Sequence, residues 1–168
     1  MQLIKISKAR YRSHLRYVFI ACIALLAIGS LVISQTLIAF FPNEDGSHFH
    51  WNLSGVMLTS IFIAWCLNKS RQHPFMLEVV YVWELKQALN KITRKMHNIK
   101  KSAKKGDVNA LTALQFSYAG SRLLWELDDN AIVMDELAIE QLALDTLMQK
   151  YQLSIDPNNY TQSMLDAF

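Results

Sequence analysis

The sequence predicts an all-α membrane protein, in which a two-helix transmembrane hairpin precedes a three-helix domain on the cytoplasmic side. Two long runs without a charged side chain, residues 17–41 and 51–67, are the first observation. The second is that apolar residues after the second run recur at helical spacing. The mean hydropathy of +0.12 hides this pattern, because the apolar residues are concentrated early in the chain.

The first run contains twenty-five residues, and about twenty suffice to cross a hydrocarbon core of about 30 Å. A basic stretch before an apolar run also describes a secretory signal peptide. Signal peptides, however, have apolar cores of about 7–15 residues that end at a small-residue cleavage site. The run ends instead in IAFFP at residues 38–42, which predicts an uncleaved membrane anchor.

The second run contains seventeen residues, after a short loop over 42–50. A buried helix of a soluble protein is the alternative, but such a helix usually has one polar face. Five Lys and Arg side chains precede the first run, the loop has none, and Lys69 and Arg71 follow the second run. Because cytoplasmic flanks carry the excess of Lys and Arg, both termini are expected in the cytoplasm.

Small residues at four-residue spacing predict where the two spans pack, since they let helix backbones approach closely. Ser30 and Ser34 form one such pair, and Gly55 and Thr59 form the other. Gln35 could add a hydrogen bond between the helices. The alternative is that these are isolated small residues without a specific interface.

Three further helices are predicted, over residues 74–104, 107–127 and 135–151, in a cytoplasmic domain that covers 68–152. Pro74 suits a first helical turn, and Gly106 with Asp107 predicts a tight turn between two helices. Residues 153–168 are expected to form a weakly held tail. A heptad seam on the first of these helices predicts an interface with a protein partner or a second copy; its residues are Leu85, Leu89, Ile92, Met96 and Ile99.

Charge divides the rest of the chain into two blocks. Residues 69–105 hold ten basic and two acidic side chains, whereas residues 106–168 hold two basic and ten acidic ones. The cluster Lys100, Lys101, Lys104 and Lys105 suits contact with anionic lipid, although a solvated helix end is the simpler interpretation. Nucleic acid is not expected, because no aromatic stacking pattern accompanies the lysines.

Two groups of residues could hold a metal ion. His48 and His50 lie close to Glu44 and Asp45 in the loop, and these ligand types suit zinc or copper. A solvated polar turn is the alternative. Glu126, Asp128 and Asp129 could hold a divalent cation, but pairing with the basic helix, through Arg94, Lys95 or Lys101, is the more ordinary role for them.

No motif of a known catalytic class is recognisable in the sequence, and no cofactor is expected. Cys22 and Cys66 fall inside apolar runs, where a thiol behaves as a small hydrophobe. The expected function is a non-enzymatic, membrane-anchored helical scaffold that binds another protein. The alternative is a membrane sensor that binds a metal or small ligand through the outer loop.

Three blocks of the sequence carry a family resemblance: ARYRSHL at 9–15, HPFMLEVVYVWELKQALNKI at 73–92 and GSRLLWELDDN at 120–130. They resemble an uncharacterised family, a domain of unknown function found in small bacterial membrane proteins. The resemblance implies a two-span protein of the bacterial inner membrane. It implies no activity, cofactor or catalytic residue.

Overall fold

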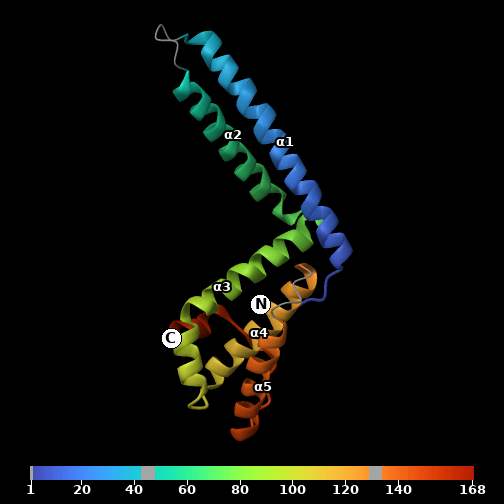
Figure 1. Cartoon of the computed structure of the whole chain (residues 1–168), viewed down its shortest axis with the longest axis vertical. Coiled ribbons are helices and arrows are strands. Elements are labelled where there is room, and N and C mark those ends of the chain that lie inside the picture. The colour runs from blue at the N-terminus through green and yellow to red at the C-terminus, as the bar shows by residue number, and fades with distance from the viewer. Residues whose placement is uncertain (1, 43–47, 129–133) are drawn as a thin grey trace. The chain divides into compact units, whose positions relative to one another are not determined.

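The computed structural model of the chain describes residues 2–42, 48–128 and 134–168, and over these residues it is helical, without a strand. Within these described residues, five α-helices and four short 3₁₀ helices follow one another (Figure 1). In chain order they are α1 (Lys8–Phe40), α2 (Phe49–Lys69), η1 (Ser70–Gln72), η2 (Pro74–Met76), α3 (Leu77–Ala103), α4 (Val108–Asp128), α5 (Met134–Lys150), η3 (Pro157–Asn159) and η4 (Gln162–Ala167).

The chain divides into two compact units, which are described separately. The hairpin unit is Ala9–Val80, and the helical unit combines the residues up to Lys8 with Tyr81–Phe168. This division differs from the expected segments. The residues up to Lys8 and residues 153–168 belong with the helical unit, and residues 9–16 and 68–80 belong with the hairpin unit.

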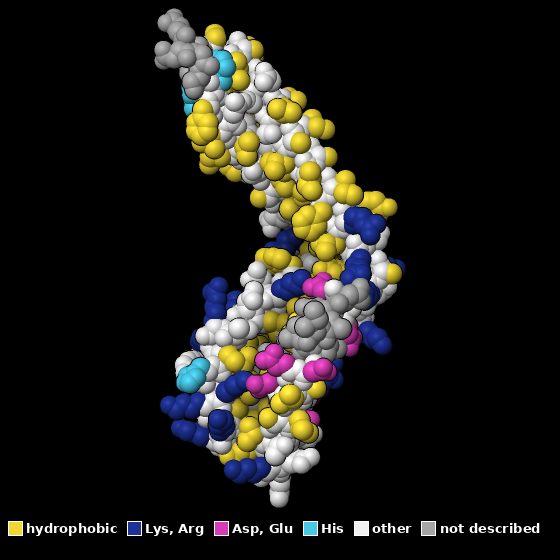
Figure 2. All heavy atoms as spheres, viewed as in Figure 1, with side chains coloured by type: hydrophobic (Ala, Val, Ile, Leu, Met, Phe, Trp, Pro, Cys, Tyr) yellow, Lys and Arg dark blue, Asp and Glu magenta, His cyan; other side chains and the backbone are white. Residues whose placement is uncertain are grey.

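In the hairpin unit, α1 and α2 run side by side in opposite directions (Figure 1). Their large apolar side chains point outward: Phe19 is 60% exposed, Ile28 65% and Ile61 63%. Figure 2 shows this apolar cover along the face in view. Only 6% of the most apolar window of α1 and 11% of that of α2 are buried. A helix in the core of a soluble protein would instead be buried on its apolar side.

A short irregular segment ends the hairpin unit before α3. Pro74 occupies the first turn of η2, where its missing N–H costs no hydrogen bond. The His73 side chain caps this turn by accepting a hydrogen bond from the Phe75 backbone N–H, at 3.2 Å. The helix predicted from Pro74 therefore begins as a 3₁₀ turn and becomes α-helical at Leu77.

In the helical unit, α4 is the central element. Five consecutive residues from Ala110 to Leu114 are all buried, which means that neighbours cover this part of the helix on every side. Gly120 allows the close approach of α3, since a Cβ there would lie 3.2 Å from the methyl groups of both Leu85 and Leu89. Larger residues at position 120 would push the two helices apart.

The turn between α3 and α4 has the chemistry that the sequence predicts. Gly106 adopts a left-handed conformation with φ +85°, which residues with a Cβ rarely adopt. The Asp107 carboxylate accepts a hydrogen bond from the Ala110 backbone N–H at 3.0 Å and so caps α4. The Tyr151 hydroxyl donates to the Lys104 carbonyl oxygen at 2.7 Å, so the residue that follows α5 holds this turn in place.

The C-terminal segment is more firmly held than the sequence suggests. Tyr160 is 2% exposed and stacks on Phe116 at a centroid distance of 4.3 Å. Leu165 is buried too, and its carbonyl oxygen accepts a hydrogen bond from Lys95 Nζ at 2.7 Å. Residues 157–168 thus complete the core of the helical unit, and the expectation of a weakly held tail is wrong.

The residues before α1 also belong to the helical unit. The Leu3 backbone N–H donates to Asn158 Oδ1 at 2.9 Å, and that of Ile4 donates to the Tyr81 hydroxyl at 2.7 Å. Burial and this hydrogen bond act on Tyr81 in opposite directions, and burial prevails, so the pKa of Tyr81 is raised. Residues 3 and 4 are therefore tied to η3 and to α3.

Candidate functional site

The four small residues predicted to pack the hairpin lie together between α1 and α2. A Cβ at Gly55 would lie 2.7 Å from the Ser30 carbonyl oxygen and 3.1 Å from Ser34 Cβ. Ser34 and Thr59 are 3% and 2% exposed, in a hairpin whose other side chains mostly point outward. Here the two helices approach as closely as their backbones allow, as small residues at four-residue spacing permit.

Two further residues complete this contact. A Cβ at Gly29 would lie 2.8 Å from the Thr59 methyl group, so Gly29 is also required for the close approach. The Ser34 hydroxyl forms a hydrogen bond with the Asn52 side chain, whereas Gln35 is exposed. Gly29 and Asn52 were not predicted from the sequence, although Gly29 is the one glycine of the first charge-free run and lies directly beside Ser30.

A polar cluster lies at the opposite end of the hairpin unit, where α1 begins. Glu78 Oε1 accepts a hydrogen bond from Arg10 Nη1 at 3.2 Å, and Glu78 Oε2 lies 3.4 Å from His14 Nδ1. The His14 ring stacks on Phe75 with centroids 4.0 Å apart. Burial acts to raise the pKa of Glu78, but its hydrogen bonds and the Arg10 charge outweigh this and lower it. This cluster ties η2 and the start of α3 to α1.

The two histidines of the predicted metal site flank the start of α2. His48 precedes the helix and is half-buried, and exposed His50 lies with its ring centroid 4.7 Å from that of Trp51. Within the described part of the chain, no three His, Cys, Asp or Glu side chains gather closely enough to hold a metal ion. Glu44 and Asp45 lie outside the described residues, so this metal site stays a prediction.

The heptad residues of α3 lie inside the helical unit. Leu85, Ile92 and Ile99 are fully buried and Leu89 is 7% exposed, while Met96 is half-buried. Leu85 and Leu89 pack against α4 at Gly120. The prediction that this face binds a partner or a second copy is therefore wrong for the folded unit, because α4 and the C-terminal segment already cover it.

The lysine cluster divides between two environments. Lys100 Nζ lies 2.7 Å from Glu140 Oε1 and so pairs with α5. Lys101, Lys104 and Lys105 are exposed near the end of α3. In the acidic cluster, Asp128 pairs with Lys86 at 3.2 Å rather than with the predicted partners, and Asp129 lies outside the described residues. Contact of the three exposed lysines with anionic lipid stays a prediction.

Glu140 is the centre of the polar contact between α3, α4 and α5. It accepts hydrogen bonds from Lys100 Nζ at 2.7 Å and from the Tyr118 hydroxyl at 2.9 Å. These two bonds and the Lys100 charge lower the pKa of Glu140 against the effect of burial. Burial, followed by the bond to Glu140 and its negative charge, raises the pKa of Tyr118.

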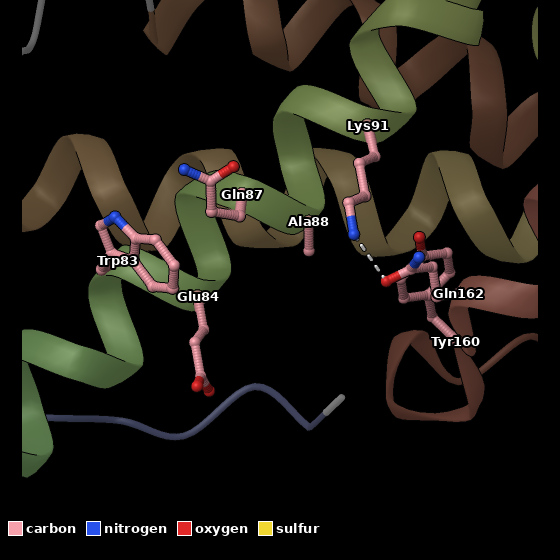
Figure 3. Close-up of a pocket in the computed structure, with 7 residues that line it drawn as sticks. All are labelled: Trp83, Glu84, Gln87, Ala88, Lys91, Tyr160 and Gln162. Atoms are coloured by element: carbon pink, nitrogen blue, oxygen red, sulfur yellow. Dashed lines mark hydrogen bonds between the residues drawn. The ribbon is translucent and has the colours of Figure 1, made fainter. Parts of the chain in front are cut away.

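An open cleft of about 460 Å³ lies between α3 and the C-terminal segment (Figure 3). Its wall consists of Trp83, Glu84, Gln87, Ala88, Lys91, Tyr160 and Gln162. The Lys91 ammonium group donates a hydrogen bond to Gln162 Oε1 at 2.9 Å across one end.

The sequence of the chain matches one described family over residues 1–165, under the description "Protein of unknown function (DUF3087)". The chain belongs to this family. Membership in DUF3087 confirms the resemblance to an uncharacterised family, and the description assigns no activity or residue role to carry over. No match was found among curated proteins or solved structures.

Proposed function

We propose that this DUF3087 protein is a non-enzymatic membrane protein whose α1 and α2 cross the bilayer and hold the helical unit at its cytoplasmic surface. The exposed apolar cover of α1 and α2 carries this proposal. If the hairpin lay in water and not in a bilayer, water would have to hydrate the side chains of Phe19, Ile28, Ile61 and their neighbours. Most of these side chains are more than half exposed. Burying each such side chain in hydrocarbon is favourable by about 1.5–3 kcal/mol.

The flanking charges support an orientation with both termini in the cytoplasm. Arg10, Arg12 and Arg16 precede the apolar part of α1, and Lys69 and Arg71 follow that of α2. The excess of Lys and Arg at one end of a hairpin sets its orientation in the membrane. The same end of the unit is also fixed internally by the hydrogen bond between Arg10 and Glu78, with His14 Nδ1 3.4 Å from the Glu78 carboxylate.

The helical unit offers α5 as the surface for binding another protein. Ile139 and Leu142 are 71% and 68% exposed and lie three residues apart, so both belong to one helix face. Ala138 and Ala143 beside them are exposed as well. This face of α5, and not the heptad of α3, is the surface that binds another protein.

Membrane extraction combined with reporter fusions tests this function. We expect the full chain to remain in the membrane pellet after treatment with alkaline carbonate and to dissolve in detergent. A cytoplasmic reporter fused after Phe168 should be active, and a periplasmic reporter fused there should be inactive. Recovery of the intact chain in the soluble fraction without detergent would overturn the membrane assignment, and the opposite reporter pattern would overturn the orientation.

A further inference from the structure

A groove on the hairpin unit points to a lipid site. Its volume is about 390 Å³, within the range of about 300–1,000 Å³ that is typical of small-ligand sites. On α1 its wall is one helix stripe, at Val18, Ala21, Cys22 and Leu25. Small side chains at two of these positions leave the space open.

The second wall repeats this spacing along α2 and the residue that follows it. It consists of Ile63, Cys66, Leu67 and Ser70, which again lie three, four and seven residues apart. Each helix thus contributes a cysteine to the groove, and neither cysteine is part of a disulfide. The groove is therefore an apolar slot between two stripes. Ser70 lies at one end of the slot, its polar end.

The segment after α2 closes the polar end of the slot. His73, Phe75 and Met76 line the groove there. Phe75 is held in position by its stack on His14, which in turn lies next to Glu78. The wall at this end is consequently fixed by several contacts, so the groove is a shaped site rather than a gap between two side chains.

We propose that this groove holds one acyl chain of an anionic phospholipid, a proposal that rests on the membrane function above. The stripe from Val18 to Leu25 rises about 10 Å along α1, which reaches well into one leaflet of a hydrocarbon core of about 30 Å. In a bilayer, hydrocarbon fills such an apolar slot more favourably than water does. The apolar walls thus select an acyl chain.

Charge at the polar end selects the head group. The hairpin unit carries five Arg and Lys side chains around this end and, outside the 42–50 loop, one acidic side chain, Glu78. Glu78 is already engaged by Arg10 and His14. Arg16 and Lys69 are exposed. Arg16 lies two residues before Val18 in the sequence, and Lys69, whose Nζ lies 5.1 Å from the centroid of the Trp65 ring, directly precedes Ser70. An anionic head group would lie within reach of this positive charge, which favours it over a zwitterionic one.

Spin-labelled lipids in vesicles test the proposal with the full chain. The protein is reconstituted in phosphatidylcholine vesicles that contain a trace of phosphatidylglycerol or of phosphatidylcholine with a nitroxide on the acyl chain. The motionally restricted fraction of each label is measured by electron paramagnetic resonance at low salt. We expect the restricted site to prefer phosphatidylglycerol by about fivefold.

A matched pair of variants assigns the preference to the groove. Ala21→Leu with Cys66→Leu fills the slot, whereas Ala24→Leu with Ala64→Leu adds similar bulk at two exposed positions of the same helices that do not line it. The first pair should abolish the preference and the second should retain it. Equal restriction of both labels in the wild type, or a preference that survives in the filled variant, would overturn the lipid site. Absence of any restricted lipid would instead indicate that the hairpin does not insert, which contradicts the proposed function itself.

Discussion

The two units place their large apolar side chains in opposite ways. Of the thirty-three residues of α1, only Tyr11 and Ser34 are buried, whereas more than half of the shorter α4 is buried. In α1, Gly29, Ser30 and Ser34 face α2, and most of the large apolar side chains face outward. In α4 the large apolar residues face the core. This inverted arrangement is the one expected of helices in lipid. Hydrocarbon solvates large apolar side chains there, and small residues allow the helix backbones to pack closely.

A buried charge in the helical unit should have the largest effect. Ile92→Glu places a carboxylate at a fully buried position, where it has no described partner, and should lower the free energy of unfolding of this unit by about 4 kcal/mol or more. Ile139→Glu makes the same change at a side chain that is 71% exposed and should alter stability by less than about 0.5 kcal/mol. Thermal unfolding of the detergent-solubilised protein, followed by circular dichroism, measures both. Similar losses in the two variants would contradict the burial contrast.

Bulk between the two hairpin helices should be the next most damaging change. Gly55→Leu would place side-chain atoms against the Ser30 backbone, which cannot move aside as a side chain can, and should cost about 1–3 kcal/mol. Titration of the protein in mixed micelles with dodecyl sulfate, followed by tryptophan fluorescence, measures helix separation. Ala64→Leu at an exposed position of the same helix is the control. A wild-type transition for Gly55→Leu would show that the close approach does not stabilise the hairpin.

The exposed face of α5 should govern association with another protein. Ile139→Ser with Leu142→Ser removes two large exposed apolar side chains and should weaken binding by about tenfold or more. Crosslinking in native membranes, read as the yield of the crosslinked species, measures the effect. Val108→Ser changes another exposed apolar residue of the helical unit and should leave the yield unchanged. An unchanged yield in the α5 variant would remove this face from the proposal.

Acid should weaken the contact of α3 and α4 with α5 by a smaller amount. The pKa of Glu140 is below its ordinary value of 4.5 in the folded unit, so its contribution is present above about pH 4.5 and is lost as the pH falls through the lowered pKa. The Lys100 and Glu140 side chains are 40% and 41% exposed, and solvent therefore limits this contribution to about 1 kcal/mol or less. Glu140→Gln should flatten the acid limb of stability against pH, and Glu136→Gln, an exposed change on the same helix, should not. Identical acid limbs for all three proteins would contradict the assignment.

Mutation of the two loop histidines should have the smallest effect, here on the affinity for zinc, if the hairpin serves only as a membrane anchor. The wild type and a His48→Ala, His50→Ala variant should then bind zinc with the same weak affinity in an isothermal titration of the detergent-solubilised protein. Binding at least tenfold tighter in the wild type would favour the metal-sensor alternative. The titration thereby decides between an outer loop that only connects two helices and one that senses a ligand.

Much of the secondary structure could be predicted because its causes are local. Charge-free runs, the Gly106 and Asp107 turn and the 3.6-residue periodicity each depend on neighbouring residues, and the observed helix ends lie within a few residues of the predicted ones apart from the start of α1. That helix begins at Lys8 rather than Tyr17, since basic side chains interrupt the apolar run without breaking the helix. The apolar run thus predicted the apolar part of α1, but not the length of the helix.

The candidate sites were harder to predict, because only some of their residues are marked by a pattern in the neighbouring sequence. Ser30, Ser34, Gly55 and Thr59 could be singled out because small residues at helical spacing are a local signal. The buried role of Tyr160 carried no such signal, since it depends on Phe116, forty-four residues earlier in the chain. The groove between Cys22 and Cys66 was equally hidden, because it exists only where two separate stripes face each other.

The sequence alone determined that the chain is helical, that two helices are apolar enough to cross a bilayer, and where charge gathers along it. Only the tertiary structure decided which apolar face is covered. It buries the heptad of α3 beneath α4 and the C-terminal segment, and it leaves Ile139 and Leu142 on α5 exposed. Periodicity reveals that a helix has an apolar face, but the partner of that face depends on contacts between residues far apart in the chain.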